Sequence, residues 1–180
     1  MNKNLKILIA TALGIALFVV LTLCLQVPVF ENYYLCLGYV AMAVFCYSFG
    51  TVSGTIVGVL GVVLYCLLTS GLRGMPGWAL GNVAIGIGLG LTFAKTKTHK
   101  NKVLKYVIWI AAVILSVAVG ILGIKSLIDS LIKSQPFLAR AAMNLYAFVA
   151  DAAVLILALP VCELLDRPAG KLLKDKRQAD

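Results

Sequence analysis

Hydrophobic residues occupy most of this chain in long runs that short polar segments separate. Each of six runs holds 17 to 19 residues, and only the last contains an ionisable side chain, Asp151. A helix of roughly 20 apolar residues crosses about 30 Å of hydrocarbon, so each run is long enough for one crossing. The pattern predicts an all-α integral membrane protein, a compact bundle of six transmembrane helices. The runs are residues 7–25, 33–49, 51–68, 78–94, 106–124 and 141–159.

The break between the second and third runs is the shortest in the chain. Only Gly50 separates them, and no charge marks the turn. A single helix over residues 33–68 would hold 36 residues, which far exceeds the thickness of a bilayer. We therefore predict two helices that meet in a tight turn at Gly50.

Composition agrees with a lipid environment and leaves little room for anything else. Hydrophobic residues make up 62% of the 180 residues, and charged residues only 13%. We predict one membrane domain over residues 1–168 and a basic cytoplasmic tail over residues 169–180. The first run follows Lys3 and Lys6 as in a signal peptide, but it lacks an Ala-x-Ala cleavage site. It is expected to be a retained helix.

The basic residues are unevenly shared between the two sides that six spans define. With an even number of spans both termini lie on one side, and that side collects twelve Lys and Arg residues against four on the other. Basic residues concentrate in cytoplasmic segments, so the termini are predicted to be cytoplasmic and the protein to lie in the cell membrane. The same rule explains the net charge of +9 without nucleic acid. The four outer basic residues are Arg73, Lys125, Lys133 and Arg140.

The sequence carries no recognisable catalytic or metal-binding motif. Its five cysteines stand far apart, and the single histidine, His99, lies in a lysine-rich segment. There is no nucleophile elbow and no phosphate-binding loop, so the chain has no usual route to hydrolyse ATP. We expect no enzymatic activity, no metal and no cofactor; any ATP is used by partner subunits.

Small residues recur four positions apart and so line single helix faces. Gly50, Gly54 and Gly58 do so in the third run, and Ala12 and Ala16 in the first. Such faces let helix backbones approach closely in lipid. Two interpretations remain open: packing within the subunit, and docking of another membrane protein.

Polar side chains at membrane depth point to a cavity. Asp151 lies about ten residues into the last run and shares a helical face with Asn144 and Phe148. Tyr39 and Asn82 fall in the outer half of their spans. Because intramembrane polar groups usually face a bundle interior or a wet cavity, we predict an outward-facing pocket. The alternatives are interhelical hydrogen bonds for the two asparagines, and a Tyr or Ser hydroxyl as a buried partner of Asp151.

Several stretches together resemble a known family. They are the segment from Gly38 through Phe49-Gly50-Thr51-Val52-Ser53-Gly54, the segment Trp78-Ala79-Leu80-Gly81-Asn82, and the Ala-x-x-x-Ala pair of Ala12 and Ala16. From about Ala10 to Pro160 the chain resembles the S components of energy-coupling factor (ECF) transporters. S components are the substrate-binding subunits of these importers of vitamins and related micronutrients.

The resemblance implies a division of labour between this chain and its partners. The chain would bind a vitamin, riboflavin-like or other, from outside. It would then dock on a transmembrane coupling subunit and topple in the membrane as two partner ATPases hydrolyse ATP. The outer charges favour an anionic or polar ligand. Rival interpretations are a membrane scaffold or assembly factor and an ion-coupled carrier that acts alone.

The expected site residues fall into two groups. Those expected at the partner surface are Ala12, Ala16, Gly50, Gly54 and Gly58. Those expected at the ligand are Glu31, Tyr39, Arg73, Trp78, Asn82, Lys125, Arg140, Asn144, Phe148 and Asp151.

Overall fold

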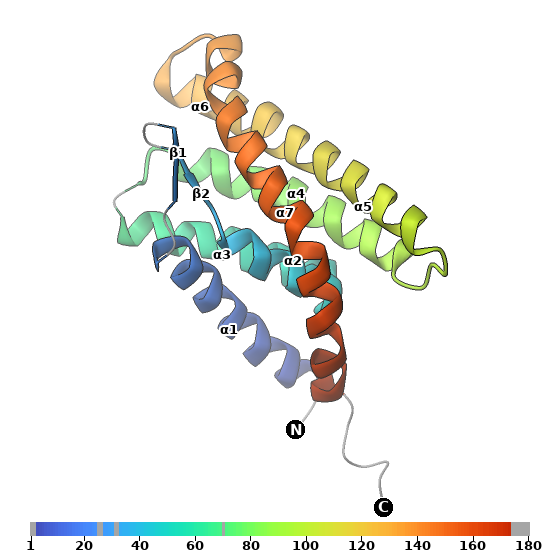
Figure 1. The fold of residues 1–180 in the computed structure, drawn as a ribbon. Coiled ribbons are helices and arrows are strands. Elements are labelled where there is room, and N and C mark those ends of the chain that lie inside the picture. The colour runs from blue at the N-terminus through green and yellow to red at the C-terminus, as the bar shows by residue number, and fades with distance from the viewer. Residues whose placement is uncertain (1–2, 25–26, 31–32, 70, 174–180) are drawn as a thin grey trace, which may run out of the picture.

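The computed structural model describes residues 3–24, 27–30, 33–69 and 71–173, which form a helical bundle with one short hairpin (Figure 1). The apolar runs form helices because a helix satisfies its own backbone hydrogen bonds in lipid. Each helix buries one face in the bundle and leaves the other face to lipid. In chain order the elements are α1 (Lys3–Cys24), β1 (Val27–Phe30), β2 (Tyr33–Leu35), α2 (Gly38–Phe49), α3 (Thr51–Leu68), α4 (Met75–Thr96), α5 (Lys102–Val117), the π-helix η1 (Ala118–Lys125), α6 (Ser126–Lys133) and α7 (Phe137–Leu173).

Five helical segments of the described chain are long and apolar enough to cross a membrane. The second predicted span, residues 33–49, is the exception, because its helix begins only at Gly38 and holds 12 residues. At 1.5 Å per residue α2 is about 18 Å long, well short of the hydrocarbon thickness. The structure thus supports five membrane-length helices and one short apolar helix, not six equal spans.

The missing helical turns of the second span belong to a β-hairpin. Val27 pairs with Leu35, Pro28 with Tyr34 and Phe30 with Tyr33, in antiparallel register. This segment holds β-branched and aromatic residues, which favour extended backbone over helix. The hairpin therefore takes residues that hydropathy alone assigns to a helix. The expected ligand residue Glu31 lies between the two strands, outside the described residues.

The last two helical segments run past the boundaries that hydropathy predicts. The segment Lys102–Lys133 is continuous through α5, η1 and α6 and holds 32 residues, about 48 Å of helix. Helix α7 holds 37 residues and continues through Pro160 and Pro168 to Leu173, past the predicted start of the tail at residue 169. Neighbouring helices can satisfy the carbonyl groups that a proline frees, so proline does not end a membrane helix. Figure 1 shows α6 and the start of α7 at the end of the molecule away from the termini.

The turn at Gly50 is as predicted, and its backbone explains the residue. Gly50 has φ 95°, a left-handed conformation that side chains other than glycine rarely adopt. It is exposed, whereas Gly54 and Gly58, also expected at a partner surface, are buried. A Cβ on Gly54 would lie 2.5 Å from the backbone nitrogen of Cys46, and one on Gly58 would meet the Met42 side chain. These two glycines let α3 pack against α2 inside the subunit, so the packing interpretation holds for them.

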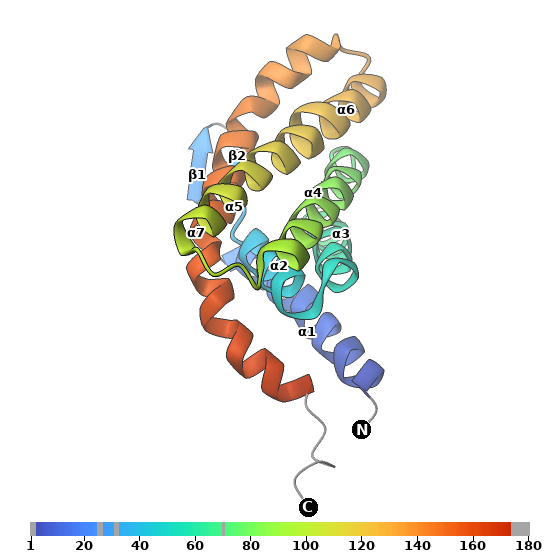
Figure 2. The ribbon, with the colours of Figure 1, turned by 90° about the vertical axis from the view of Figure 1, so that its right-hand side faces the viewer.

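Two ion pairs close the end of the bundle where the chain begins and ends. Lys97 pairs with Asp166 at 2.5 Å, and Lys105 pairs with Glu163 at 2.6 Å. Lys105 Nζ also donates to the Tyr47 hydroxyl at 3.0 Å. These contacts join the end of α4 and the first turn of α5 to the C-terminal part of α7, whose last turn lies toward the start of α1 (Figure 2). The lysine-rich connection therefore lies at the same end as the termini.

We expect Gly54→Ala to destabilise the protein, because the added methyl group overlaps the Cys46 backbone. Overpacking of this kind costs about 1–3 kcal/mol, which should lower the thermal midpoint in detergent micelles. Gly123→Ala is the matched control, since its Cβ would have no neighbour closer than 3.9 Å. Equal thermal midpoints for the two variants would contradict the close packing of α2 on α3.

Candidate functional site

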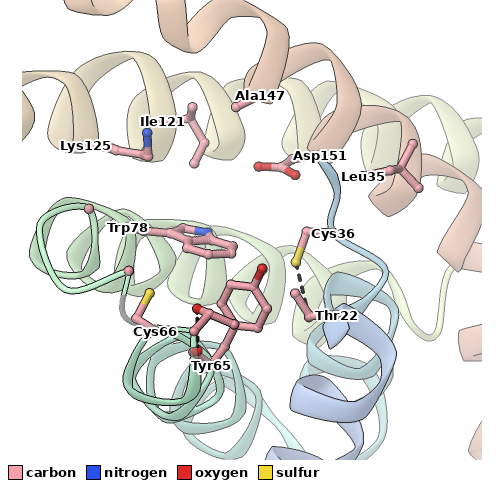
Figure 3. A pocket seen from close by; sticks show the side chains of 13 residues that line it. Thr22, Leu35, Cys36, Tyr65, Cys66, Trp78, Ile121, Lys125, Ala147 and Asp151 are labelled. Carbon is pink, nitrogen blue, oxygen red and sulfur yellow. Dashed lines mark hydrogen bonds between the residues drawn. The ribbon is translucent and has the colours of Figure 1, made fainter. Parts of the chain in front are cut away.

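A cavity of about 580 Å³ lies at the end of the bundle opposite the termini. Its walls come from the end of α1, the end of β2 and the residue after it, the end of α3, the α3–α4 connection, the start of α4, η1 and α7 (Figure 3). Cavities of 300–1,000 Å³ are typical of small-molecule sites in proteins. The lining residues are Thr22, Leu35, Cys36, Tyr65, Cys66, Thr69, Gly71, Gly74, Trp78, Ile121, Lys125, Ala147 and Asp151.

A chain of hydrogen bonds fixes the Trp78 side of the cavity. Trp78 Nε1 donates to the Tyr39 hydroxyl at 2.9 Å, and this hydroxyl donates to Asn82 Oδ1 at 2.8 Å. Asn82 Nδ2 in turn donates to the Gly58 carbonyl oxygen at 2.9 Å. Tyr39 and Asn82 are completely buried, so an unmade bond here would be costly. The chain joins α2, α3 and α4 and holds the indole of Trp78 in place.

A second polar cluster holds Lys125 on the opposite side of the cavity. Lys125 Nζ donates to Asn144 Oδ1 at 2.5 Å and to Asp129 Oδ2 at 3.2 Å. Asn144 Nδ2 donates to Ser126 Oγ at 2.9 Å, and Ser126 Oγ donates to the Ile121 carbonyl oxygen at 3.0 Å. The Ser126–Ile121 bond spans five residues at the end of the π-helix. π-Helical segments inside α-helices are frequent at functional sites, and η1 supplies Ile121 and Lys125 to the cavity wall.

Close helix contact positions η1 against α4. Gly81 faces Gly120, and a Cβ on either residue would lie 2.6 Å from the carbonyl oxygen of the other. The glycine pair brings the two backbones together beneath Trp78 and Lys125. This contact sets the width of the cavity between α4 and η1.

Asp151 is the one carboxylic residue among the cavity-lining residues. It is 4% exposed, and Figure 3 shows its carboxyl group projecting from α7 toward the space above the Trp78 indole. The Lys125 ammonium group and the Tyr39 hydroxyl lie near it. The cavity therefore presents one acidic and one basic side chain between aromatic and aliphatic walls.

Sequence reasoning found part of this arrangement. Of the ten residues expected at a ligand, Trp78, Lys125 and Asp151 line the cavity. Tyr39, Asn82 and Asn144 lie directly behind these three and hydrogen-bond to one another or to the lining residues. The interhelical hydrogen bonds that were the alternative for the two asparagines are therefore present.

The remaining expected residues do not line the cavity. Arg140 is buried against Asp129, with 3.9 Å between its Nη2 and Asp129 Oδ2. Phe148 is half-buried and packs on the hydrophobic core. Arg73 is exposed in the α3–α4 connection. Helix rotation and loop path turn these three side chains away from the cavity.

Most of the other lining residues gave no signal in the sequence. Ile121, Ala147 and Leu35 are ordinary membrane hydrophobes, and their neighbours Cys36 and Cys66 are buried thiols. Thr22 and Thr69 stand at span ends and, as hydroxyl residues in apolar runs, offered the one usable hint. No group of three or more potential metal ligands occurs in the described parts of the chain.

The Ala12 and Ala16 pair lies on the outside of the bundle. Both residues are exposed on α1, beside the exposed side chains of Leu8 and Leu13. The face is apolar and its centre is flat, as a helix-docking surface in lipid requires. Nothing in the described chain covers it.

The fold and cavity define a polytopic membrane protein with a small-molecule cavity at one end. Residues 2–167 match the family described as the ECF-type riboflavin transporter, S component. The chain belongs to this family, as the resemblance in the sequence predicted. The family is one of transporter subunits, which bind small molecules and work with a coupling subunit and ATPases; it is not an enzyme family.

Curated relatives match over a shorter stretch. A UPF0397 protein of Lactococcus lactis subsp. cremoris is 35% identical over 92 residues, 49% of each chain. UPF0397 protein YdcD of Lactococcus lactis subsp. lactis is 35% identical over 91 residues, 49% of this chain and 48% of the relative. A Streptococcus thermophilus UPF0397 protein is 29% identical over 90 residues, 50% of this chain and 49% of the relative. The chain thus spans about half the length of these relatives. No solved structure matches it.

We expect Tyr39→Phe to destabilise the bundle, because Asn82 Oδ1 and Trp78 Nε1 would both lose a buried partner. Each orphaned group costs about 1–3 kcal/mol, which thermal unfolding in detergent measures. The control is the double variant Tyr39→Phe with Asn82→Leu. The two changes should be clearly non-additive, since one shared hydrogen bond is lost in both. Additive losses would contradict the hydrogen-bonded chain.

Proposed function

We propose that this protein is the high-affinity substrate-binding subunit of an ECF importer that takes up riboflavin or a similar flat vitamin. The family match over residues 2–167, joined to the 580 Å³ cavity at one end of the bundle, carries the proposal. A scaffold needs no such cavity, and this favours ligand binding over a purely structural role. Aromatic residues Trp78 and Tyr65 in its wall suit a flat ring system.

The energy for uptake is proposed to come from partner subunits. We propose a transmembrane coupling subunit that docks on the exposed Ala12 and Ala16 face of α1, and two ATPases that bind this coupling subunit. A smooth apolar face supports repeated docking and release, because it holds no hydrogen bonds that must break. The rival carrier that acts alone would need ion coupling. Asp151 is the one carboxylic residue that lines the cavity, which gives that rival little support.

Substitution of Ala12 and Ala16 by Trp separates binding from transport. We expect the wild type and the double variant to bind riboflavin with equal, nanomolar affinity in detergent, because α1 contributes only Thr22 to the cavity. Uptake of labelled riboflavin by cells that express the transporter should fall at least tenfold, since the indoles block docking. Ala111→Trp, an exposed residue on α5, is the matched control and should transport normally.

Two outcomes would contradict separate parts of this assignment. If the wild type binds no riboflavin at micromolar concentration, the riboflavin proposal is wrong. If uptake survives in the double variant while riboflavin binding is intact, the docking surface is wrong and the substrate assignment stands.

We propose that the termini are cytoplasmic and that the cavity opens outside the cell membrane. The twelve basic residues assigned to the side of the termini, against four on the other, support this orientation. It also gives an importer access to external substrate.

Cysteine labelling tests the orientation. Cys24 is exposed near the cavity end of α1, and the other four cysteines are buried. A membrane-impermeant maleimide should label the wild type in intact cells but not Cys24→Ser. A cysteine introduced as His99→Cys in the Cys24→Ser background should react only after permeabilisation. The reverse pattern would place the cavity on the cytoplasmic side.

A further inference from the structure

The carboxyl oxygens of Asp151 can accept hydrogen bonds that the surrounding protein does not supply. Its carboxyl group is 4% exposed and faces the cavity. A buried carboxyl group needs hydrogen-bond donors, and those nearby are the Tyr39 hydroxyl and the Lys125 ammonium group. If neither group donates to Asp151, a bound ligand must supply the donor.

Tyr39 has no proton to give to Asp151. The Trp78 indole N–H can only donate, so the Tyr39 oxygen accepts from it. Asn82 directs its amide N–H toward the Gly58 carbonyl oxygen, so its Oδ1 faces Tyr39 and must accept. A hydroxyl group carries one proton, and that proton is therefore held by Asn82.

Lys125 has two of its three protons committed. One is donated to Asp129 in α6 and one to Asn144 in α7, and neither goes to Asp151. The remaining N–H belongs to a side chain that lines the cavity. A ligand can accept from this N–H and donate to Asp151 at the same time.

The cations beside the cavity already have an acidic partner. Lys125 and Arg140 both contact Asp129. An anionic ligand that must give up its water gains little where the cations are already paired. The anionic ligand favoured by the outer basic residues in the sequence therefore finds no unpaired cation here.

The aromatic wall fixes the shape of the ligand. Tyr65 and Trp78 meet edge to face with 5.7 Å between ring centroids. The Trp78 N–H is held by Tyr39, so the indole offers the cavity its ring atoms and no donor. A flat ring system can stack there.

We propose that Asp151 selects the ligand by accepting a hydrogen bond from a ring N–H, while Lys125 donates to a carbonyl oxygen or ring nitrogen of the same molecule. The ligand class is an uncharged planar heteroaromatic with both groups on its rim. This inference rests on the proposed function, because it assumes that the cavity is the substrate site.

The test compares riboflavin with 3-methylriboflavin, which lacks the ring N–H between two carbonyl groups. Dissociation constants are measured by intrinsic fluorescence on the full chain in detergent. Loss of this hydrogen bond, which leaves a buried acceptor without its donor, makes methylation cost about 10- to 100-fold in the wild type. In Asp151→Leu this ratio should fall to about 1–3, because the acceptor is gone. Asp166→Asn, a carboxylic residue of α7 at the far end, is the control and should keep the wild-type ratio.

A second variant guards against a failure to fold. Asp151→Asn keeps an acceptor of similar shape without the formal charge, so its ratio should lie between those of the wild type and Asp151→Leu. A ratio near 1 in the wild type, or a ratio unchanged by either substitution, overturns the inference while riboflavin binding upholds the proposed function.

Two further ligands distinguish the inference from the riboflavin assignment. Lumazine is neutral and carries the same rim of N–H and carbonyl groups, whereas thiamine is a cation. Binding of lumazine without riboflavin would contradict the riboflavin assignment and uphold the inference, provided that 3-methyllumazine binds at least tenfold more weakly. Binding of thiamine in preference to both neutral ligands overturns the inference. If none of these compounds binds, both proposals are contradicted.

Discussion

The hydrogen bond between Tyr39 and Asn82 joins the packing of this bundle to its cavity. Helix association in lipid gains little from hydrophobicity, so polar groups and close contacts must hold the helices together. Here one buried pair connects α2 to α4, and its neighbours extend the chain to the Gly58 carbonyl oxygen on α3 and the Trp78 indole. The bonds that fix the bundle therefore also fix one wall of the cavity and commit its donors.

Glycine makes this arrangement possible. Gly54 and Gly58 bring α3 against α2, and Gly81 and Gly120 bring α4 against η1. Larger residues at these positions would separate the helices and break the buried bonds between them. The glycine-rich middle of the chain is thus largely a packing device, and the exposed alanine pair on α1 is the small-residue face left for a partner.

Hydropathy predicted most of the fold, because a run of apolar residues in lipid has little choice but to be helical. It gave the Gly50 turn and five of the six helices. It failed at residues 33–37, where β2 takes residues 33–35 and the helix begins only at Gly38, because strand pairing leaves no mark in mean hydropathy. It also misplaced the ends of α7, since Pro160 ends a run of hydrophobic residues without ending the helix.

The site was predictable only where burial was chemically costly. Asp151, Lys125, Asn82 and Asn144 stand out in an apolar sequence, and the structure gathers all four in or directly behind the cavity wall. Arg140 carries the same kind of signal but faces Asp129, because depth in a span does not determine which way a side chain points. Ile121 and Ala147 line the cavity without any signal, since their role is shape alone.

A structure of the protein with riboflavin bound would show whether the cavity at the end opposite the termini is the substrate site. We expect density for the flat ring system against Trp78, with a ring N–H directed at Asp151. Riboflavin bound at any other surface, with the cavity filled only by water, would contradict it.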